Sequence, residues 1–270
     1  LLYDVENKKW SELLPPLFNL SAEILPTLKD SGEILGTILG TVAEEFGISE
    51  EAVVVVGGGD TQLAIRSMEP SANDVVIVSG TTTPIIKLVK EYEKDVEQRT
   101  WTSRHIDQDN FILEANAGVT GLNYQRLKET FYPNEGYDVI ERELSETTYF
   151  QCVASLGSLI ADEEEPVIKG GFIFNAPVSH QLTRGSFVFS ILWDIACSIY
   201  ENYKFLCDVS SYDQNYIWAC GGGVESRALR QYLSNLLGKN IRIRDTFRQA
   251  SVLGGVFICN DALGIKNISP

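Results

Sequence analysis

Residues 53–62 read Val-Val-Val-Val-Gly-Gly-Gly-Asp-Thr-Gln, four β-branched residues followed by three glycines and one carboxylate. A run of valines is typical of a strand buried on both faces, and glycines let a backbone approach a ligand closely. The stretch therefore predicts a buried strand that delivers Asp60 to the sheet edge where α/β proteins bind ligands. The same residues also fit a plain glycine turn in which Asp60 caps a helix over residues 62–66. This segment alone leaves both interpretations open.

Composition limits the classes of function. The chain has 270 residues, 44% of them hydrophobic, which is enough for one large domain or two ordinary ones. The net charge of −15 argues against general binding to nucleic acid or to an anionic membrane, because both need basic patches. No apolar run is long enough to span a bilayer, and the first residues do not resemble a secretion signal. We therefore expect a soluble, cytoplasmic, globular protein.

Cysteine and histidine do not form a metal-binding pattern. The five cysteines are far apart and include no Cys-x-x-Cys pair, so we interpret them as buried thiols in a reducing compartment. His105 and His180 are also far apart, and we expect no histidine-based metal site. The acidic stretch at 162–166 is typical of a solvated loop.

The order of the predicted elements indicates a mixed α/β sheet. Residues 11–50 read as helical segments broken by prolines, with an amphipathic stretch at 38–46 that ends at Gly47, and the polar residues at 67–74 read as a domain boundary. Several adjacent strands followed by alternating helices predict a mixed sheet with helices against it. The predicted strands are 75–79, 85–90, 99–105, 111–116, 171–175, 215–220 and 240–244, and the predicted helices are 119–131, 189–206, 226–237 and 248–262.

A second glycine turn follows the predicted strand at 75–79. Ser79-Gly80-Thr81-Thr82-Thr83 combines one glycine with hydroxyl side chains. Backbone N–H groups and hydroxyls of this kind bind phosphate oxygens. The alternative is an ordinary β-hairpin turn without a ligand.

A third glycine turn enters a helix. Gly221-Gly222-Gly223-Val224-Glu225-Ser226 precedes the predicted helix, and a helix N-terminus beside glycines suits a nucleotide phosphate. The turn also comes close to the dinucleotide fingerprint, with Asp245 lying 22 residues beyond Gly223. An NAD-dependent oxidoreductase of the Rossmann type is therefore an alternative, although a Rossmann fold places this fingerprint after its first strand.

In this order, the three turns resemble those of the FGGY family of carbohydrate kinases over nearly the whole chain. The family's catalytic-carboxylate motif resembles residues 57–62, its second phosphate motif resembles 80–82, and its adenosine motif resembles 221–226. The resemblance implies the ribonuclease-H-like fold shared by sugar kinases, actin and heat-shock ATPases. The motif Gly-Gly-Gly-Asp-x-Gln-Leu at 57–63 resembles in particular that of the family branch that phosphorylates the quorum-signalling sugar autoinducer-2.

A fourth segment, at 113–127, resembles the family's Gly-x-x-x-Gln-x-x-Leu stretch, whose glycine and glutamine share one helical face beside the nucleotide. By the same resemblance, Asp60 accepts the proton of the sugar hydroxyl, with Thr61 and Gln62 at the substrate. The nucleotide-binding residues that the resemblance implies are Gly80, Thr81, Thr82, Gly121, Gln125, Gly221, Gly222, Gly223 and Ser226.

The function that the resemblance implies is an ATP-dependent kinase that phosphorylates a hydroxyl of a sugar or polyol, with ATP and Mg²⁺ as cofactors. No metal ligand is assigned to the chain. Phosphoryl transfer needs mainly alignment and charge neutralisation, so one base, a magnesium ion and phosphate donors suffice. Within the family's organisation, residues 1–67 are the end of the sugar-binding lobe, which carries Asp60, and residues 68–270 are the nucleotide-binding lobe.

The sequence also departs from the family pattern. The family's first phosphate loop, Asp-x-Gly-Thr, is absent and the first residues resemble the interior of a fold, so we expect a fragment that is inactive alone. Phe189–Asp194 and Gln249-Ala250 differ from the family's Arg-Ala-x-x-Glu-Gly and Glu-Ala. A non-catalytic nucleotide-binding or regulatory module is the alternative from another class. The oligomeric state stays open, with a homodimer as one arrangement.

Overall fold

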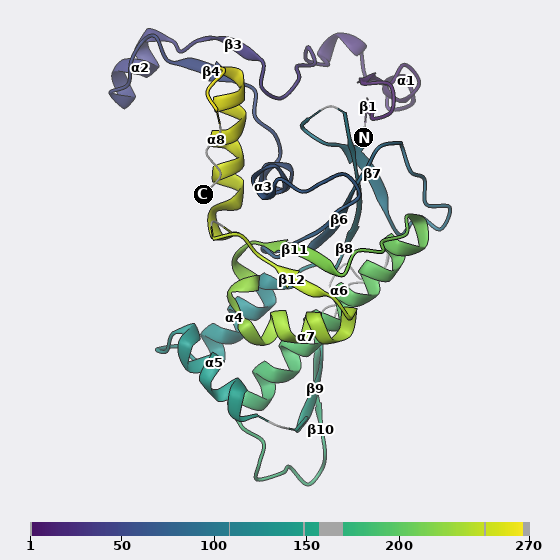
Figure 1. Ribbon diagram of the computed structural model, residues 1–270, viewed down its shortest axis with the longest axis vertical. Helices are drawn as coiled ribbons and strands as arrows, with labels where there is room; N and C mark the ends of the chain where they lie inside the picture. The colour runs from purple at the N-terminus through teal and green to yellow at the C-terminus, as the bar shows by residue number, and fades with distance from the viewer. Residues whose placement is uncertain (1, 108, 148, 157–169, 246, 267–270) are drawn as a thin grey trace.

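A mixed sheet of six strands forms the centre of the structure (Figure 1). The computed structural model describes residues 2–107, 109–147, 149–156, 170–245 and 247–266. The strands lie in the order β12-β11-β5-β6-β8-β7, in which β12, β11 and β5 are parallel while β5, β6, β8 and β7 are antiparallel to one another in turn. This confirms the predicted mixed sheet. The strands are β5 (Val75–Val78), β6 (Pro84–Val89), β7 (Trp101–Arg104), β8 (Phe111–Asn116), β11 (Tyr216–Cys220) and β12 (Asn240–Arg242).

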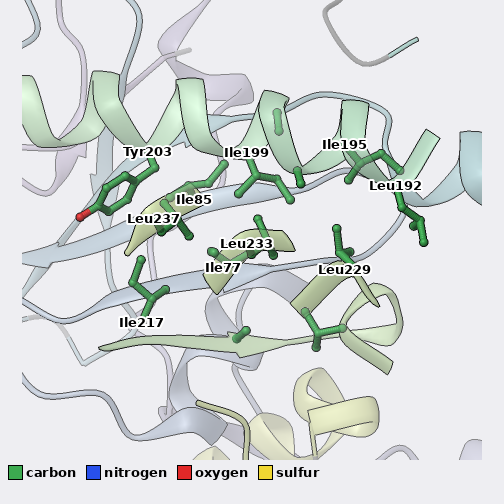
Figure 2. Close-up of a cluster of buried hydrophobic side chains, with 14 of the residues drawn as sticks. Ile77, Ile85, Leu192, Ile195, Ile199, Tyr203, Ile217, Leu229, Leu233 and Leu237 are labelled. Carbon is green, nitrogen blue, oxygen red and sulfur yellow. The ribbon is translucent and has the colours of Figure 1, made fainter. Parts of the chain in front are cut away.

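Helices cover both faces of this sheet. Successive residues of a strand point to opposite faces. In β5, Ile77 therefore packs against α6 (Arg184–Val209) and α7 (Arg227–Leu237), as Figure 2 shows. Val76 packs on the other face, with residues of α3 (Asp60–Met68) and α8 (Ala250–Ala262). The first layer is extended by α4 (Gly121–Phe131) and α5 (Tyr137–Glu146), which contact α6.

Most element predictions from 75 onward are confirmed, with boundaries that shift by a few residues. The long helix α6 begins at Arg184, earlier than the predicted 189, because Thr183 and Ser186 form a capping box. Two elements were not predicted: α5, and β9 (Cys152–Ser155), which pairs with β10 (Gly171–Phe174). The acidic stretch at 162–166 lies outside the described residues.

The prediction of a buried strand at 53–56 is wrong. Val53–Val55 forms β4, and Val53 and Val54 are 36% and 41% exposed. In the described structure β4 pairs with β3 (Ile34–Thr37) in a ribbon of two antiparallel strands, so it has too few neighbours to bury both faces. The β-strand β3 also replaces part of the helix expected at 11–50.

The remaining elements of the N-terminal segment are short. The helix α2 (Gly40–Phe46) ends at Gly47 in the left-handed conformation, with φ of 65°, as the sequence predicts. Within the described residues, no helix combines the length and apolar character needed to cross a bilayer. The other elements are β1 (Tyr3–Asp4), β2 (Lys9–Trp10), α1 (Leu14–Leu17) and the 3-10 helix η1 (Ala22–Ile24).

Candidate active site

Asp60 is the first residue of α3, at the end of the helix that points toward the sheet's glycine turns. The N-cap is Gly59, so the interpretation of Asp60 as a helix cap is wrong. One carboxylate oxygen, Oδ1, accepts the backbone N–H of Thr61 at 2.7 Å, and the residue is exposed. This contact orients the carboxylate and leaves the side chain accessible to a substrate.

Contacts from three other segments hold the backbone around Asp60. Ser31 Oγ donates to the carbonyl of Gly57 at 2.6 Å, and Ser251 Oγ, in the first turn of α8, donates to the carbonyl of Asp60 at 3.0 Å. The side chain of Ile106 packs against Gly58 so closely that a Cβ there would lie 2.8 Å from it. The glycine turn is therefore fixed by the protein itself before any ligand binds.

The loop at 79–83 connects β5 and β6, so it is a β-hairpin turn, as one interpretation expected. Its conformation is set by neighbours: Gly80 N–H donates to Thr82 O at 3.0 Å, and the N–H of Leu122 donates to Thr81 O at 3.3 Å. A Cβ on Gly121 would lie 2.0 Å from the Gly80 carbonyl oxygen. Glycine at 121 therefore lets the start of α4 pack directly on the hairpin.

The third glycine turn, at 221–223, is hydrogen-bonded to the same hairpin. Gly221 has φ of 92° and donates its N–H to Phe247 O at 2.9 Å, and Gly223 N–H donates to Ser79 O at 3.0 Å. Gly222, between them, has no neighbouring atom within 4 Å of the place that a Cβ would take, so the space beside it is open. The turn follows β11, an inner strand of a partly antiparallel sheet, which does not fit the Rossmann alternative.

Two adjoining cavities bring the predicted residues together. The first, which we call the Asp60 cavity, has about 360 Å³, and the second, the Tyr137 cavity, has about 430 Å³. Gly80, Thr81, Gly222 and Arg248 line both cavities. The other predicted residues divide between the Asp60 cavity, which takes Asp60, Thr61, Thr82 and Gly221, and the Tyr137 cavity, which takes Gly121, Gln125, Gly223 and Ser226.

Gln62 is the predicted site residue that the structure does not bring to either cavity. Its side-chain oxygen Oε1 lies against Gly59, in the turn before α3. Gln125 does line the Tyr137 cavity, and its Nε2 donates to Glu129 Oε1 at 3.1 Å within the same helix. A role for Gln62 at the substrate would therefore need its side chain to turn away from Gly59.

Helix N-termini make the cavities favourable for anions despite the acidic composition. The first residues of α3 and α8 line the Asp60 cavity, and the first residues of α4 line the Tyr137 cavity. Two helix N-termini already hold a carboxylate of the protein: in α3 the N–H of Thr61 donates to Asp60 Oδ1 at 2.7 Å, and in α7 the N–H groups of Arg227 and Ala228 donate to Glu141 Oε2 at 3.1 and 3.4 Å.

Sequence reasoning missed the contribution of α5 to the Tyr137 cavity. Tyr137, Asp138 and Glu141 all line it, and the ring of Tyr137 lies 5.7 Å from that of Tyr124. Tyr137 is 48% exposed, so part of its face is available to a planar ligand, and partial burial raises its pKa. The signal for this helix was Val139, Ile140 and Leu144, apolar at helical spacing after Gly136.

Comparison with known sequences identifies two domains of one family. Residues 1–66 match the N-terminal domain of the FGGY family of carbohydrate kinases, and residues 165–263 match its C-terminal domain. YoaC of Bacillus subtilis (strain 168), which bears a provisional name as a sugar kinase, is 45% identical over 97% of this chain and 54% of its own length. The chain spans about half the length of the curated relatives it matches.

More distant relatives carry the names of different sugars. A xylulose kinase of Staphylococcus epidermidis (strain ATCC 12228) is 23% identical over 98% of this chain and 53% of its own. An autoinducer-2 kinase of Enterobacter sp. (strain 638) is 20% identical over 98% of this chain and 52% of its own. Sequence identity therefore gives no preference to the autoinducer-2 branch.

Solved structures show the same fold. A ligand-bound xylulose kinase from Lactobacillus acidophilus superposes with a TM-score of 0.78 at 17% identity, covering 99% of this chain and 55% of the other. A Plasmodium falciparum glycerol kinase with ADP gives a TM-score of 0.79 at 14% identity, covering 99% and 54%. These likenesses confirm the predicted actin-like fold of sugar kinases. Since both family domains match in order, and since the fold agrees, the chain belongs to the FGGY family of carbohydrate kinases.

Proposed function

We propose that this chain supplies the catalytic base and the nucleotide site of an ATP-dependent kinase that phosphorylates a hydroxyl of a sugar or polyol. The observation that carries the proposal is the pair of adjoining cavities, which share Gly80, Thr81 and Gly222. A kinase must place an acceptor hydroxyl and a nucleotide on opposite sides of the transferred phosphoryl group. The Asp60 cavity suits the acceptor side, and the Tyr137 cavity suits the adenosine side.

In this proposal Asp60 accepts the proton of the attacking hydroxyl. Its carboxylate is exposed and is oriented by the N–H of Thr61. A general base needs both access to the substrate hydroxyl and a defined orientation. Thr81 and Thr82 line the same cavity as Asp60, so their hydroxyls would donate hydrogen bonds to the oxygens of the transferred phosphoryl group. The adenosine would lie against Tyr137 and the open side of Gly222.

A magnesium ion fits the donors of the Asp60 cavity. Thr81 and Thr82 offer hydroxyl oxygens, and the carboxylate of Asp60 would attract the ion through one of its waters while its free oxygen accepts the proton. Mg²⁺ is usually held by one or two carboxylates together with substrate phosphates, and retains several waters. When bound, the ion would neutralise negative charge on the phosphate oxygens. No cluster of three His, Cys, Asp or Glu side chains is needed for this mode, and none occurs in the part of the chain that the structure describes.

The division into lobes, the location and the substrate belong to the same proposal. We assign residues 1–67 to the sugar-binding lobe and 68–270 to the nucleotide-binding lobe, in a cytoplasmic enzyme whose described cysteines are all free thiols. Because the chain spans about half the length of its relatives, we expect it to bind nucleotide but not to phosphorylate sugar by itself. The names of the relatives make xylulose and the autoinducer-2 sugar the first acceptors to test in a protein of the relatives' full length that contains this chain, which we call the two-lobed kinase.

Isothermal titration with ATP, ADP and NAD in the presence of Mg²⁺ tests the nucleotide site. We expect the chain to bind ATP and ADP, and the Gly222→Val variant to lose at least about tenfold in affinity, because valine would fill the open space beside the turn. Gly171→Val is the matched control, since Gly171 in β10 also has open space but lines neither cavity. Preference for NAD, or no binding of any adenine nucleotide, would contradict the proposal.

A further inference from the structure

Arg248 occupies a special position between the two cavities. Among the described residues that line the Asp60 cavity or the Tyr137 cavity, it is the sole lysine or arginine, and it lines both. Its companions at this junction are Gly80, Thr81 and Gly222, which have no charged side chain. A single positive charge therefore lies where the two cavities meet.

The backbone beside Arg248 is anchored to the third glycine turn. Arg248 belongs to the 3-10 helix η3 (Phe247–Gln249), and the carbonyl of Phe247 accepts the N–H of Gly221 at 2.9 Å. The next residues, from Ala250, begin α8, whose first turn also holds Asp60 through Ser251. The backbone of Arg248 is thus held between the residue bonded to Gly221 and the first turn of α8, which is bonded to Asp60.

The side chain of Arg248 is held by a weak ion pair. Its Nε lies 2.8 Å from Glu225 Oε1, with the two side chains 58% and 41% exposed. Ion pairs this exposed to water add little to stability, so exchanging the partner costs little. A phosphate offers the guanidinium two parallel hydrogen bonds and more negative charge than a carboxylate.

We propose that Arg248 leaves Glu225 and binds phosphate oxygens of the nucleotide at the junction of the two cavities. This inference rests on the proposed kinase function, which requires the phosphoryl group to pass between those cavities. The other charged side chains of the Tyr137 cavity are the carboxylates of Asp138, Glu141 and Glu225, all of which repel a polyphosphate. Arg248 offsets that repulsion, and Glu225 keeps the guanidinium at the junction while no nucleotide is bound.

The test compares binding of adenosine, ADP and ATP, each with Mg²⁺, to the chain and to Arg248→Gln by isothermal titration. We expect Arg248→Gln to weaken ADP and ATP by about tenfold or more while adenosine changes by less than about twofold, because adenosine has no phosphate. Unchanged adenosine binding also shows that the variant is folded. Arg248→Lys should weaken ADP less than Arg248→Gln, since lysine keeps the charge but not the planar fork.

Lys204→Gln is the control for loss of one positive charge, because Lys204 pairs with Glu201 on the exposed surface of α6, at 2.8 Å. It should leave all three ligands unchanged. Equal losses for adenosine and ATP in Arg248→Gln, or no loss for either, would overturn the role of Arg248 and leave the kinase proposal standing. If the unmodified chain binds none of the three ligands, the proposed function fails, and the inference fails with it.

Discussion

Gly121 and Gly222 are both glycines of the candidate active site, but for different physical reasons. Gly121 has no room for a side chain, because a Cβ there would lie 2.0 Å from the carbonyl oxygen of Gly80. Gly222 has no neighbour within 4 Å of that place. The first glycine is explained by packing of one protein segment on another, and the second by space left for something outside the protein.

The carboxylate of Asp60 is expected to be essential for phosphoryl transfer. Asp60→Asn keeps the size of the side chain but removes its ability to accept a proton, so kcat of sugar phosphorylation in the two-lobed kinase should fall by about 10²- to 10⁴-fold. Affinity for ADP should stay within about twofold, because Asp60 does not line the Tyr137 cavity. Asp213→Asn, at an exposed position outside both cavities, is the control.

A retained kcat in Asp60→Asn would remove Asp60 from the role of base. Loss of ADP binding together with kcat would instead indicate that the substitution disturbs the start of α3. The two explanations are separated by measuring binding and turnover on the same preparation.

Glu114 gives the folded protein a pH dependence. It lies half-buried in β8, and burial raises its pKa from an ordinary 4.5 to about 7, partly opposed by a hydrogen bond from Asn116 Nδ2 at 3.4 Å. The folded chain therefore holds this proton more tightly than the unfolded chain. The stabilising contribution is complete below pH 4.5 and is lost as the pH rises through 7.

We expect Glu114→Gln to remove this contribution to the pH dependence of the free energy of unfolding. The difference between variant and parent, measured by urea unfolding, should favour the variant more at about pH 8 than at about pH 5. Glu50→Gln, at an exposed position in the segment before β4, should show no such trend. A constant difference across this range would show that Glu114 titrates normally.

At the scale of elements, α3 and α8 are in closer contact than ordinary packed helices. A Cβ on Gly254 of α8 would lie 1.9 Å from the backbone oxygen of Leu63 in α3. The obstacle is backbone, so the two helices would have to move apart to admit any side chain. The helix that carries Asp60 is therefore positioned by a helix almost two hundred residues later in the sequence, as the Ser251–Asp60 hydrogen bond also shows.

Gly254→Ala and Gly255→Ala form a matched pair on α8. Gly254→Ala should lower the free energy of unfolding by about 1–3 kcal/mol, because it overpacks the contact with α3. Gly255 has no neighbour within 4 Å of a Cβ, so Gly255→Ala should be neutral or stabilise by up to about 1 kcal/mol, as alanine favours a helix. Chemical denaturation measures both, and equal effects would contradict the close contact.

Whether the burial of a helix or strand could be predicted from the sequence depended on whether the elements that pack or pair with it could be inferred. β5 and β6 are explained by their own β-branched residues, and α7 by its apolar spacing and by Gly238 in the left-handed conformation. The valines of β4 carry an equally strong pattern, yet they are exposed, because burial depends on which strands pair with them. A residue pattern therefore predicts that a segment is a strand more reliably than it predicts whether the strand is buried.

The same limit applies to the candidate site. The three glycine turns could be found because each has a local motif, and the structure brings them to adjoining cavities. Tyr137 and Arg248 could not be found in this way, since they reach the cavities from distant parts of the chain without a motif of their own. Gln62 shows the converse case, in which a motif residue lies against Gly59 instead of lining a cavity.

At the scale of the whole molecule, the N-terminal segment and the central sheet differ in burial. Large apolar side chains between 13 and 46 are exposed, among them Leu13 at 79%, Leu39 at 71% and Phe46 at 69%. In β6, by contrast, every residue is buried. The segment contacts the sheet directly where Arg104 of β7 donates to the carbonyls of Val5 and Glu6, and β4 contacts α8.

This contrast predicts a gradient of local stability. Amide hydrogens of the β3–β4 ribbon should exchange with solvent at least about 100-fold faster than those of the β6–β8 pair, although both pairs are antiparallel. The reason is that opening the ribbon exposes little new apolar surface. Hydrogen–deuterium exchange followed by mass spectrometry measures both pairs in one sample, and comparable protection of the two would show that the segment is held as firmly as the sheet.

The helix α3, which begins at Asp60, contacts both α8 and β5. The turn at 221–223 is bonded to the hairpin at 79–83, since Gly223 N–H donates to Ser79 O, and the backbone of Asp60 is bonded to α8 through Ser251. In the proposed kinase, a movement of the residues before Asp60 would change the route by which an acceptor enters, while the contact between Ser251 and Asp60 would keep the base in place. In the proposed kinase, substitutions in the N-terminal segment would therefore change the choice of acceptor with the contact between Ser251 and Asp60 unaltered.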